Sequence, residues 1–465
     1  MKLAAIPGSD QVKKFLADTA LNYAIDYLAK DPDRNLPKLL SLIEKLATEQ
    51  GHKDAVNLFR KRVCGDPKVM SQVRRLATNP KMVKKFISNW VIASQIIGTP
   101  RRRALEKETG LHIPSLLLVD PTSACNLRCT GCWAGEYRKT DRLEPELFSR
   151  IIDEAKDLGI YWIVLSGGEP FAYPQLLDVV AQHPDMGFMA YTNGTLIDEK
   201  TADRLAELGN LSPAFSLEGP RELTDRRRGQ GVFDKVMRAM ALLRERGVLF
   251  GASLTVTREN ADVIFSDEFI DFLVEQGVVY CWSFHYIPIG RGPDLNMMIT
   301  PEQRAKLAER VPYIRATKPI LMADFWNDGY ATEGCIAGGR MYFHINAAGD
   351  VEPCAFVHFA VDNIREKSLK EVLASPLFKA YQRRQPFHEN HLAPCPIIDA
   401  PEALREIVKE SGAHPTHPGA EDVLTGETAA YLDEYSKKWV HLADEIVAAR
   451  NEAAKKQMSV ASGSR

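Results

Sequence analysis

The stretch "CNLRCTGCW" (residues 125–133) holds three of the chain's eight cysteines, Cys125, Cys129 and Cys132, within eight residues. Thiolates at this density bind zinc or an iron–sulfur cluster. A four-iron cluster held by three cysteines keeps one iron without a protein ligand, and a small molecule can bind there. The alternatives are a zinc ion whose fourth ligand lies elsewhere in the chain and cysteines that are simply buried.

The sequence around this stretch alternates between short apolar segments and amphipathic ones, beginning at about residue 113. Six such strand–helix alternations predict a parallel α/β sheet, arranged as a partial (β/α)6 TIM-type barrel. The loops at the carboxyl ends of the strands carry the active site in such folds. Strands are expected at 115–120, 161–166, 187–192, 213–218, 249–257 and 278–288, and helices at 144–159, 173–183, 201–209, 234–247 and 269–277.

Polar and glycine-rich motifs follow the second, third and fourth expected strands. Paired glycines let the backbone approach a ligand closely, and a carboxylate can hold an ammonium group. The simpler explanation for Ser216 and Glu218 is that they cap the end of their strand. The motif residues are Gly167, Gly168, Glu169 and Pro170, then Thr192 and Asn193, then Ser216 and Glu218, with Arg228 in the following "DRRRGQGVF".

These motifs, in this order, resemble the radical S-adenosylmethionine (SAM) superfamily over residues 113 to about 320. The resemblance implies a [4Fe-4S] cluster on Cys125, Cys129 and Cys132, whose open iron binds SAM. It also implies that reductive cleavage of SAM gives a 5′-deoxyadenosyl radical, which abstracts hydrogen from a substrate. In the family, the segment matching Gly167–Pro170 binds the amino group of SAM. Ser216 and Glu218 would be candidates for ribose contacts, and Arg228 matches the family's arginine.

One position departs from the family pattern. The family usually has an aromatic residue directly before the third cysteine, against the adenine, whereas this chain has Gly131 there and Trp133 after the cysteine. A glycine at this place also occurs in the hopanoid-adenosylating branch, which modifies lipids. The adenine contact is therefore left open by the sequence.

A second cysteine set, Cys335, Cys354 and Cys395, follows the expected barrel. The spacing CX13GX4C from Cys335 to Cys354 resembles the start of a SPASM or twitch domain, and "MYFHINAAGDVEPC" predicts a hairpin. The resemblance implies a second, auxiliary iron–sulfur cluster. Its fourth ligand would be His388, His391, Asp399, Cys281 or the substrate. The alternative is a structural domain without a cluster. Trp326 and Asp328 are candidates to line the pocket or to pack between domains.

The N-terminal region is expected to be helical, and residues 60–103 hold twelve Lys or Arg against one acid, Asp66. With the interleaved apolar run 86–97, this favours docking on an anionic membrane surface. Nucleic acid is a weaker second partner, and a solvated face or packing on the barrel is the simpler explanation.

The expected domains are a helical region (1–112), the partial barrel (113–320), the auxiliary cluster domain (321–400) and a helical tail (401–465). We expect an iron–sulfur oxidoreductase or transferase that takes electrons from a small donor such as flavodoxin or ferredoxin. Peptide and lipid or isoprenoid substrates rank close together. The alternative function is a non-catalytic iron–sulfur or zinc protein that binds nucleic acid through its basic helices. The sequence has no membrane span or signal-peptide core, which predicts a cytoplasmic protein, or one peripheral to the inner face of the membrane.

Overall fold

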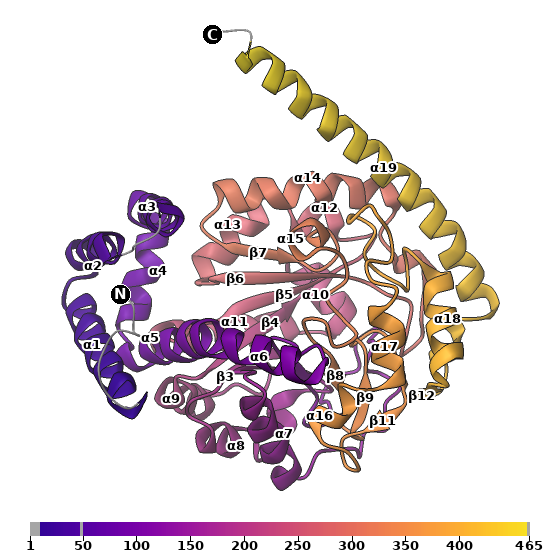
Figure 1. Cartoon of the computed structure of the whole chain (residues 1–465), viewed down its shortest axis with the longest axis horizontal. Coiled ribbons are helices and arrows are strands. Elements are labelled where there is room, and N and C mark those ends of the chain that lie inside the picture. Colours follow the sequence, from indigo (N-terminus) through magenta and orange to yellow (C-terminus); the bar gives the residue numbers. More distant parts are fainter. Residues whose placement is uncertain (1–9, 47–49, 463–465) are drawn as a thin grey trace.

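The computed structural model describes residues 10–46 and 50–462, and its centre is one ten-stranded sheet (Figure 1). Seven of these strands run parallel in chain order: β1 (Leu117–Val119), β2 (Trp162–Leu165), β3 (Gly187–Thr192), β4 (Leu211–Leu217), β5 (Gly251–Val256), β6 (Tyr280–His285) and β7 (Leu321–Asp324). Six of them are the strands expected from the sequence, and β7 adds one. The chain therefore has the partial TIM-type barrel that the alternation predicts.

Helices connect the parallel strands and cover the outside of the sheet. They are α7 (Pro145–Asp157), α8 (Leu176–Gln182), α9 (Glu199–Leu208), α10 (Arg221–Arg228), α11 (Val232–Glu245), α12 (Ala261–Ile264), α13 (Asp267–Gln276) and α14 (Pro301–Thr317). Strands β1 to β4 are buried at nearly every position, which explains their continuous apolar runs, whereas alternate side chains of β5 and β6 are only partly buried. The 17-residue helix α14 and the strand β7 had no counterpart in the expected pattern.

The cysteine-rich C-terminal domain extends the same sheet. Strand β8 (His344–Ile345) pairs in parallel with β1, and β9 (Asp350–Glu352) pairs antiparallel with β8 as the predicted hairpin. Gly349 has a φ of 93° in the turn, where a Cβ would lie 2.6 Å from Asn363 Oδ1. The domain continues through β10 (Phe359–Ala360), β11 (Asp362–Asn363), α16 (Leu369–Val372) and α17 (Pro376–Gln382), with α15 (Gly329–Thr332) before it.

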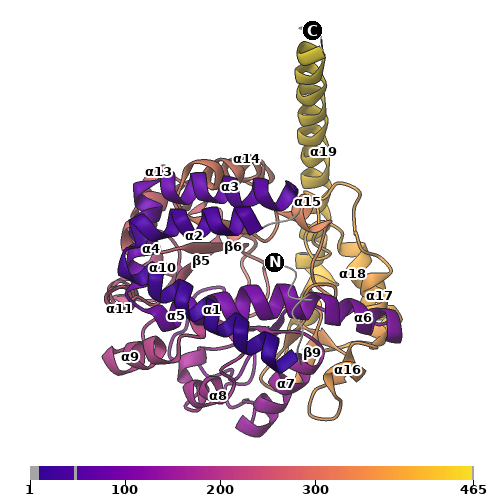
Figure 2. The ribbon, with the colours of Figure 1, turned by 60° about the vertical axis from the view of Figure 1, so that its left-hand side comes forward.

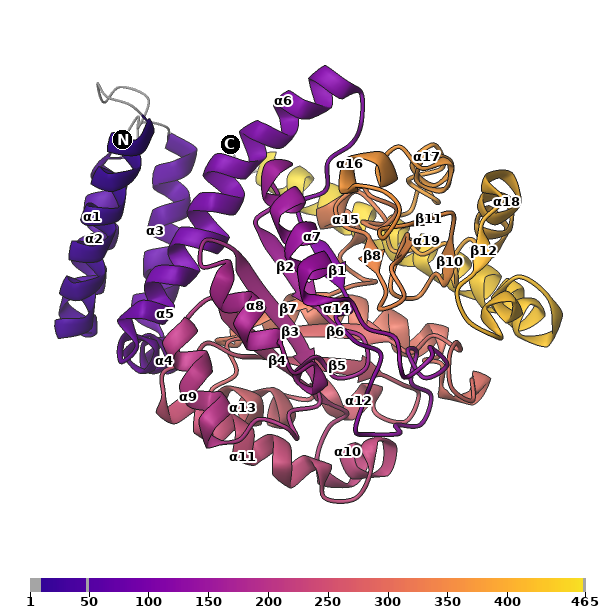
Figure 3. The ribbon, with the colours of Figure 1, turned by 90° about the horizontal axis from the view of Figure 1, so that it is seen from below.

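Helices α1 to α4 stack beside the barrel, and α5, η2 and α6 then run across it (Figures 2 and 3). They are α1 (Asp10–Lys30), α2 (Pro32–Leu46), α3 (Gln50–Gly65), α4 (Pro67–Ala77), α5 (Pro80–Lys85), the helical segment η2 (Phe86–Gly98) and α6 (Thr99–Thr109). Their side chains pair with carbonyl groups where barrel helices end. Arg75 donates to Val248 and Gly277, and Asn79 to Ala206 and Arg246.

Two more side chains of this region make the same kind of contact. Asn89 donates to the carbonyls of Pro184 and Met186, after α8, and Arg102 donates to that of Gly159, after α7. Ala206 is in the last turn of α9, where carbonyls have no partner within the helix, and the other acceptors lie in the turns that follow α7, α8, α11 and α13. Part of the basic stretch therefore holds the N-terminal helices on the barrel, as the packing alternative suggested.

The chain ends in α18 (Pro401–Ser411), β12 (His414–Pro415) and the long helix α19 (Gly426–Ser462). The first half of α19 buries Leu432, Trp439 and Ala443, and Trp439 Nε1 donates to the Leu392 carbonyl. Beyond Arg450, which donates to the Ala308 carbonyl of α14, the helix reaches away from the body of the protein (Figures 1 and 2).

We expect Arg102→Met to lower the stability of the protein. The substitution keeps the aliphatic stem but leaves the buried Gly159 carbonyl without its donor, at a cost of about 1–3 kcal/mol. The urea midpoint followed by circular dichroism checks this. Arg103→Met, at the exposed neighbouring position, is the matched control and should leave the midpoint unchanged. Equal midpoints for both variants would show that the capping contact contributes nothing.

Candidate active site

A cavity of about 190 Å³ lies at the carboxyl ends of the barrel strands. Cys125, Cys129 and Cys132 line it together, as expected for ligands of one group. So do the motif residues Gly167, Gly168, Glu169, Thr192, Asn193, Ser216 and Arg228. Pro170 and Glu218 are buried but are not among the lining residues. The remaining wall is mainly apolar: Leu116, Leu118, Trp133, Trp162, Val164, Met189, Tyr191, Trp282, Phe284, Ile287, Phe325, Ile336 and Phe356.

The cysteine loop is bonded to the segment that follows β2. Gly168 N donates to the Thr122 carbonyl and Glu169 N to that of Ala124. A Cβ on Gly168 would lie 2.1 Å from the Ala124 oxygen, and Gly167 has a φ of 105°. The paired glycines thus let this segment lie directly against the start of the cysteine loop. From the sequence, the glycines were expected to allow the close approach of a ligand instead.

Glu169 is fully buried and joins the ends of two strands. Its Oε1 accepts from the Thr192 hydroxyl at 2.6 Å, and its Oε2 accepts from Asn193 N at 2.7 Å. Burial raises the pKa of Glu169 despite these hydrogen bonds. A positive group in the adjoining cavity would stabilise the charged carboxylate there.

Glu218 lies behind two arginines at the end of β4. Its Oε1 accepts from Arg227 Nη1 and Arg228 Nε, both at 2.7 Å, and its buried Oε2 has no hydrogen-bond partner. Arg227 also donates to the carbonyls of Thr130 and Gly131 and so fixes the cysteine loop. Sequence reasoning singled out Arg228 and missed Arg227, although both stand in the same "DRRRG" motif.

The ring of Tyr286 occupies the place that a side chain at position 131 would need. Gly131 has a φ of 60°, and a Cβ there would lie 2.7 Å from Tyr286 Cε2. Tyr286 follows β6 and lines the same cavity as the three cysteines. An aromatic ring therefore does stand beside the third cysteine, but it comes from the end of the last predicted strand.

The second cysteine set lines a neighbouring cavity of about 260 Å³. Cys335, Cys354 and Cys395 all face it, and so do Trp326 and Asp328. The two cavities share a wall made by Leu116, Trp162, Trp282, Phe325, Ile336 and Phe356.

Four residues considered for the fourth ligand of this set do not line the second cavity. Asp399 accepts two hydrogen bonds from Arg304 and one from Cys395 N. His388 Nδ1 accepts from Asn390 N, and the His391 ring packs against Tyr330 at 5.4 Å. Cys281 is fully buried within β6. The residues that line the second cavity include none of these four.

Comparison with known proteins agrees with this geometry. The family model described as "Radical SAM superfamily" matches residues 119–264, and one described as "Iron-sulfur cluster-binding domain" matches 335–396. The mycofactocin maturase MftC of Mycolicibacterium smegmatis is 30% identical over 323 residues, which cover 65% of this chain and 80% of the relative. The chain belongs to the radical SAM superfamily.

Two further matches are a relative with a similar sequence and a solved structure with a similar fold. The AdoMet-dependent heme synthase of Methanosarcina barkeri is 26% identical over 56% of this chain and 82% of its own length. Streptococcus suis SuiB shares the fold, with a TM-score of 0.52 at 19% identity over 67% of this chain and 83% of its own. The protein is a radical SAM enzyme, and the alternative of a non-catalytic nucleic-acid-binding protein is not favoured.

The cysteine sites fit iron–sulfur clusters by their chemistry. Burial raises the pKa of Cys125 and of Cys335 to about 11 and the pKa of Cys354 to about 12. Buried thiols lose their protons when a metal supplies compensating positive charge. When bound, the [4Fe-4S] cluster and SAM supply a 5′-deoxyadenosyl radical through reductive cleavage of SAM, and the radical abstracts hydrogen from the substrate. This radical SAM chemistry needs a one-electron reductant, and the C-terminal domain binds an additional cluster.

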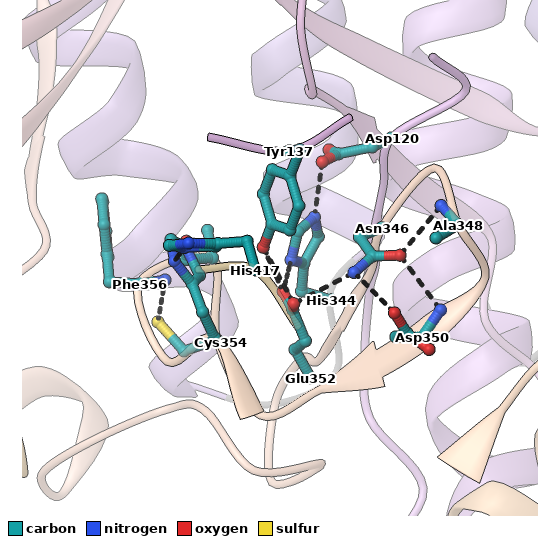
Figure 4. A network of polar contacts seen from close by, with 12 residues as sticks. Asp120, Tyr137, His344, Asn346, Ala348, Asp350, Glu352, Cys354, Phe356 and His417 are labelled. Atoms are coloured by element: carbon teal, nitrogen blue, oxygen red, sulfur yellow. Dashed lines mark hydrogen bonds and ion pairs between the residues drawn. The ribbon is translucent and has the colours of Figure 1, made fainter. Parts of the chain in front are cut away.

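A buried charge network joins the barrel to the auxiliary cluster domain (Figure 4). His344 lies between Asp120, at 2.9 Å from its Nε2, and Glu352, at 2.6 Å from its Nδ1. Tyr137, from the loop after Cys132, donates to both oxygens of Glu352. Sequence reasoning missed this network because its members lie far apart in the chain and have no motif.

We expect His344 to make stability depend on pH. Burial alone would lower the pKa of His344, but the carboxylates of Asp120 and Glu352 raise it to about 10. Its unfolded value is about 6.5, so the stabilisation is complete below pH 6.5 and is lost as pH rises through 10.

The measurement is the free energy of unfolding of the wild type and His344→Gln between pH 6 and 10.5. The difference between the two proteins should shrink as pH rises. A difference that stays constant over this range would contradict a protonated His344.

Proposed function

We propose that this radical SAM enzyme binds its first cluster through Cys125, Cys129 and Cys132 and an auxiliary cluster through Cys335, Cys354 and Cys395. Each trio lines one cavity, which supports the assignment. The substrate binds between the two sites.

Glu169 receives the amino group of SAM, because its buried carboxylate lies in the cavity beside the three cysteines. Gly167, Gly168 and Pro170 hold it there, and Thr192 and Asn193 orient it. Ser216 lines the cavity and is the candidate for the ribose contact. Glu218 positions Arg227 and Arg228. Tyr286 takes the place of the aromatic residue that is missing at position 131 and contacts the adenine.

The substrate is an apolar molecule, of the lipid or isoprenoid class, rather than an extended peptide. The observation that carries this proposal is the wall shared by the two cavities, which consists of aromatic and aliphatic side chains. A peptide backbone placed there would lose its hydrogen bonds to water without finding partners, whereas an apolar molecule would not. Heme, named as the product of one group of relatives, is likewise a flat molecule with a largely apolar body.

The substrate class is tested with the reconstituted holoenzyme, SAM and dithionite. Cells in which the gene is deleted are extracted, and the chloroform–methanol fraction and the aqueous peptide fraction are added separately. We expect the organic fraction to increase 5′-deoxyadenosine formation several-fold over the rate without extract. Stimulation by the peptide fraction alone would contradict the proposal.

Glu169→Gln should weaken SAM binding by roughly tenfold or more, because a hydrogen bond to a charged group contributes about 1.5–3 kcal/mol. Tyr286→Leu should weaken it through loss of the aromatic contact. Equilibrium dialysis with the reconstituted protein measures both. Glu222→Gln, at an exposed position of α10, is the control. Wild-type affinity in Glu169→Gln would remove Glu169 from the SAM site.

Two partners complete the proposal. A small electron donor such as flavodoxin or ferredoxin reduces the first cluster.

An anionic membrane surface is the second partner, because Val91, Ile96 and Ile97 are exposed close to the exposed Arg101 and Arg103. Apolar side chains next to arginines suit the boundary between headgroups and acyl chains. Within the described ranges, no helix combines the length and the apolar character that crossing a membrane requires.

The double substitution Ile96→Asp and Ile97→Asp should reduce co-flotation with phosphatidylglycerol vesicles several-fold, since it places charge where apolar contact is needed. Val263→Asp, at an exposed apolar position on the barrel helix α12, is the control. Unchanged flotation of the double variant would reject the membrane surface.

A further inference from the structure

Tyr381 has a fully buried hydroxyl group without a hydrogen-bond partner. The residue lies near the end of α17, and its side chain is 0% exposed. A buried hydroxyl without a partner costs free energy, so native structures rarely keep one without a reason. The cysteine motifs that identify the domain give no role to this position.

Tyr381 lines the second cavity together with Cys335, Cys354 and Cys395. Its ring is fixed on two sides. A Cβ on Gly338 would lie 2.3 Å from Tyr381 Cδ1, so only glycine leaves room for the ring, and Phe387 packs edge-on with the ring centroids 5.1 Å apart. The hydroxyl is therefore held in one place beside the three cysteines.

A second tyrosine, which lines the first cavity, shows how a hydroxyl is used beside one of these cysteines. Tyr342 donates a hydrogen bond to Cys354 Sγ at 2.9 Å. A tyrosine hydroxyl carries its proton at neutral pH and can donate it. The Tyr381 hydroxyl has no acceptor within reach in the protein alone.

We propose that Tyr381 donates a hydrogen bond to the auxiliary iron–sulfur cluster, on a bridging sulfide or a cysteine sulfur. The inference rests on the assignment of Cys335, Cys354 and Cys395 as ligands of that cluster. Hydrogen bonds to the sulfurs of a cluster help set its reduction potential. The bond stabilises the more negative, reduced state, so Tyr381 makes the auxiliary cluster easier to reduce.

The test uses the full chain with Cys125, Cys129 and Cys132 changed to alanine, so that only the auxiliary cluster remains. Tyr381→Phe is added to this parent, and Tyr280→Phe, which removes a partly buried hydroxyl paired with Ser212 outside both cavities, is the control. Iron content, the midpoint potential and deuterium ENDOR of the reduced cluster after exchange into D2O are measured.

We expect Tyr381→Phe to keep the iron content of the parent, to shift the midpoint potential to a more negative value and to lose one exchangeable deuteron signal. Tyr280→Phe should match the parent in all three. An unchanged potential and deuteron signal would overturn the role of Tyr381 while the cluster assignment stands. Conversion to a three-iron cluster would also overturn it, because it would make Tyr381 a ligand rather than a donor. A parent without iron would overturn the cluster assignment and the role of Tyr381 together.

Discussion

The parallel pairing of β1 with β8 is the contact on which the rest of the molecule depends. β1 leads directly into the loop with Cys125, Cys129 and Cys132, and β8 begins the hairpin that leads to Cys354. This backbone register, with Leu118 opposite His344, places the two cysteine sets on either side of one wall. His344 adds a buried link, because it contacts Asp120 at the end of β1 and Glu352 on β9. Two neighbouring cavities with a shared wall, each lined by one cysteine set, follow from this junction.

The N-terminal and C-terminal helices pack on the outside of the barrel. Arg75 and Arg102 pair with carbonyl groups at the ends of barrel helices, so these positive charges are not available to an outside partner. The exposed Arg101 and Arg103 remain. At the other side, Arg304 of α14 is fully buried between Asp399 and the ring of Trp439 in α19, which ties the tail to the segment that carries Cys395. Part of the basic stretch therefore has a structural role. The net charge of the stretch does not distinguish the residues that bind the barrel from those that are free to meet an outside partner.

The sequence was sufficient to predict the parallel barrel, the hairpin after Cys335 and the superfamily, because strand–helix alternation and short motifs are local patterns. It was not sufficient for β7, which is a four-residue strand in a segment of mixed polarity. Contacts between distant segments were also missed. Arg227 bonds to the cysteine loop, Tyr286 fills the space left by Gly131, and Asp120, His344 and Glu352 meet only after folding. Such partners have no fixed spacing along the chain, so only the three-dimensional structure shows them.

Iron counting tests the central claim, that two separate cysteine trios hold two clusters, most directly. The anaerobically reconstituted wild type is compared with a variant in which Cys125, Cys129 and Cys132 are alanine and another in which Cys335, Cys354 and Cys395 are alanine. For two four-iron clusters we expect about eight irons in the wild type and about four in each variant. EPR of the reduced variants should show one cluster signal each, and added SAM should change only the signal of the variant that keeps the first trio. A wild type with about four irons, and none after loss of the first trio, would contradict the account.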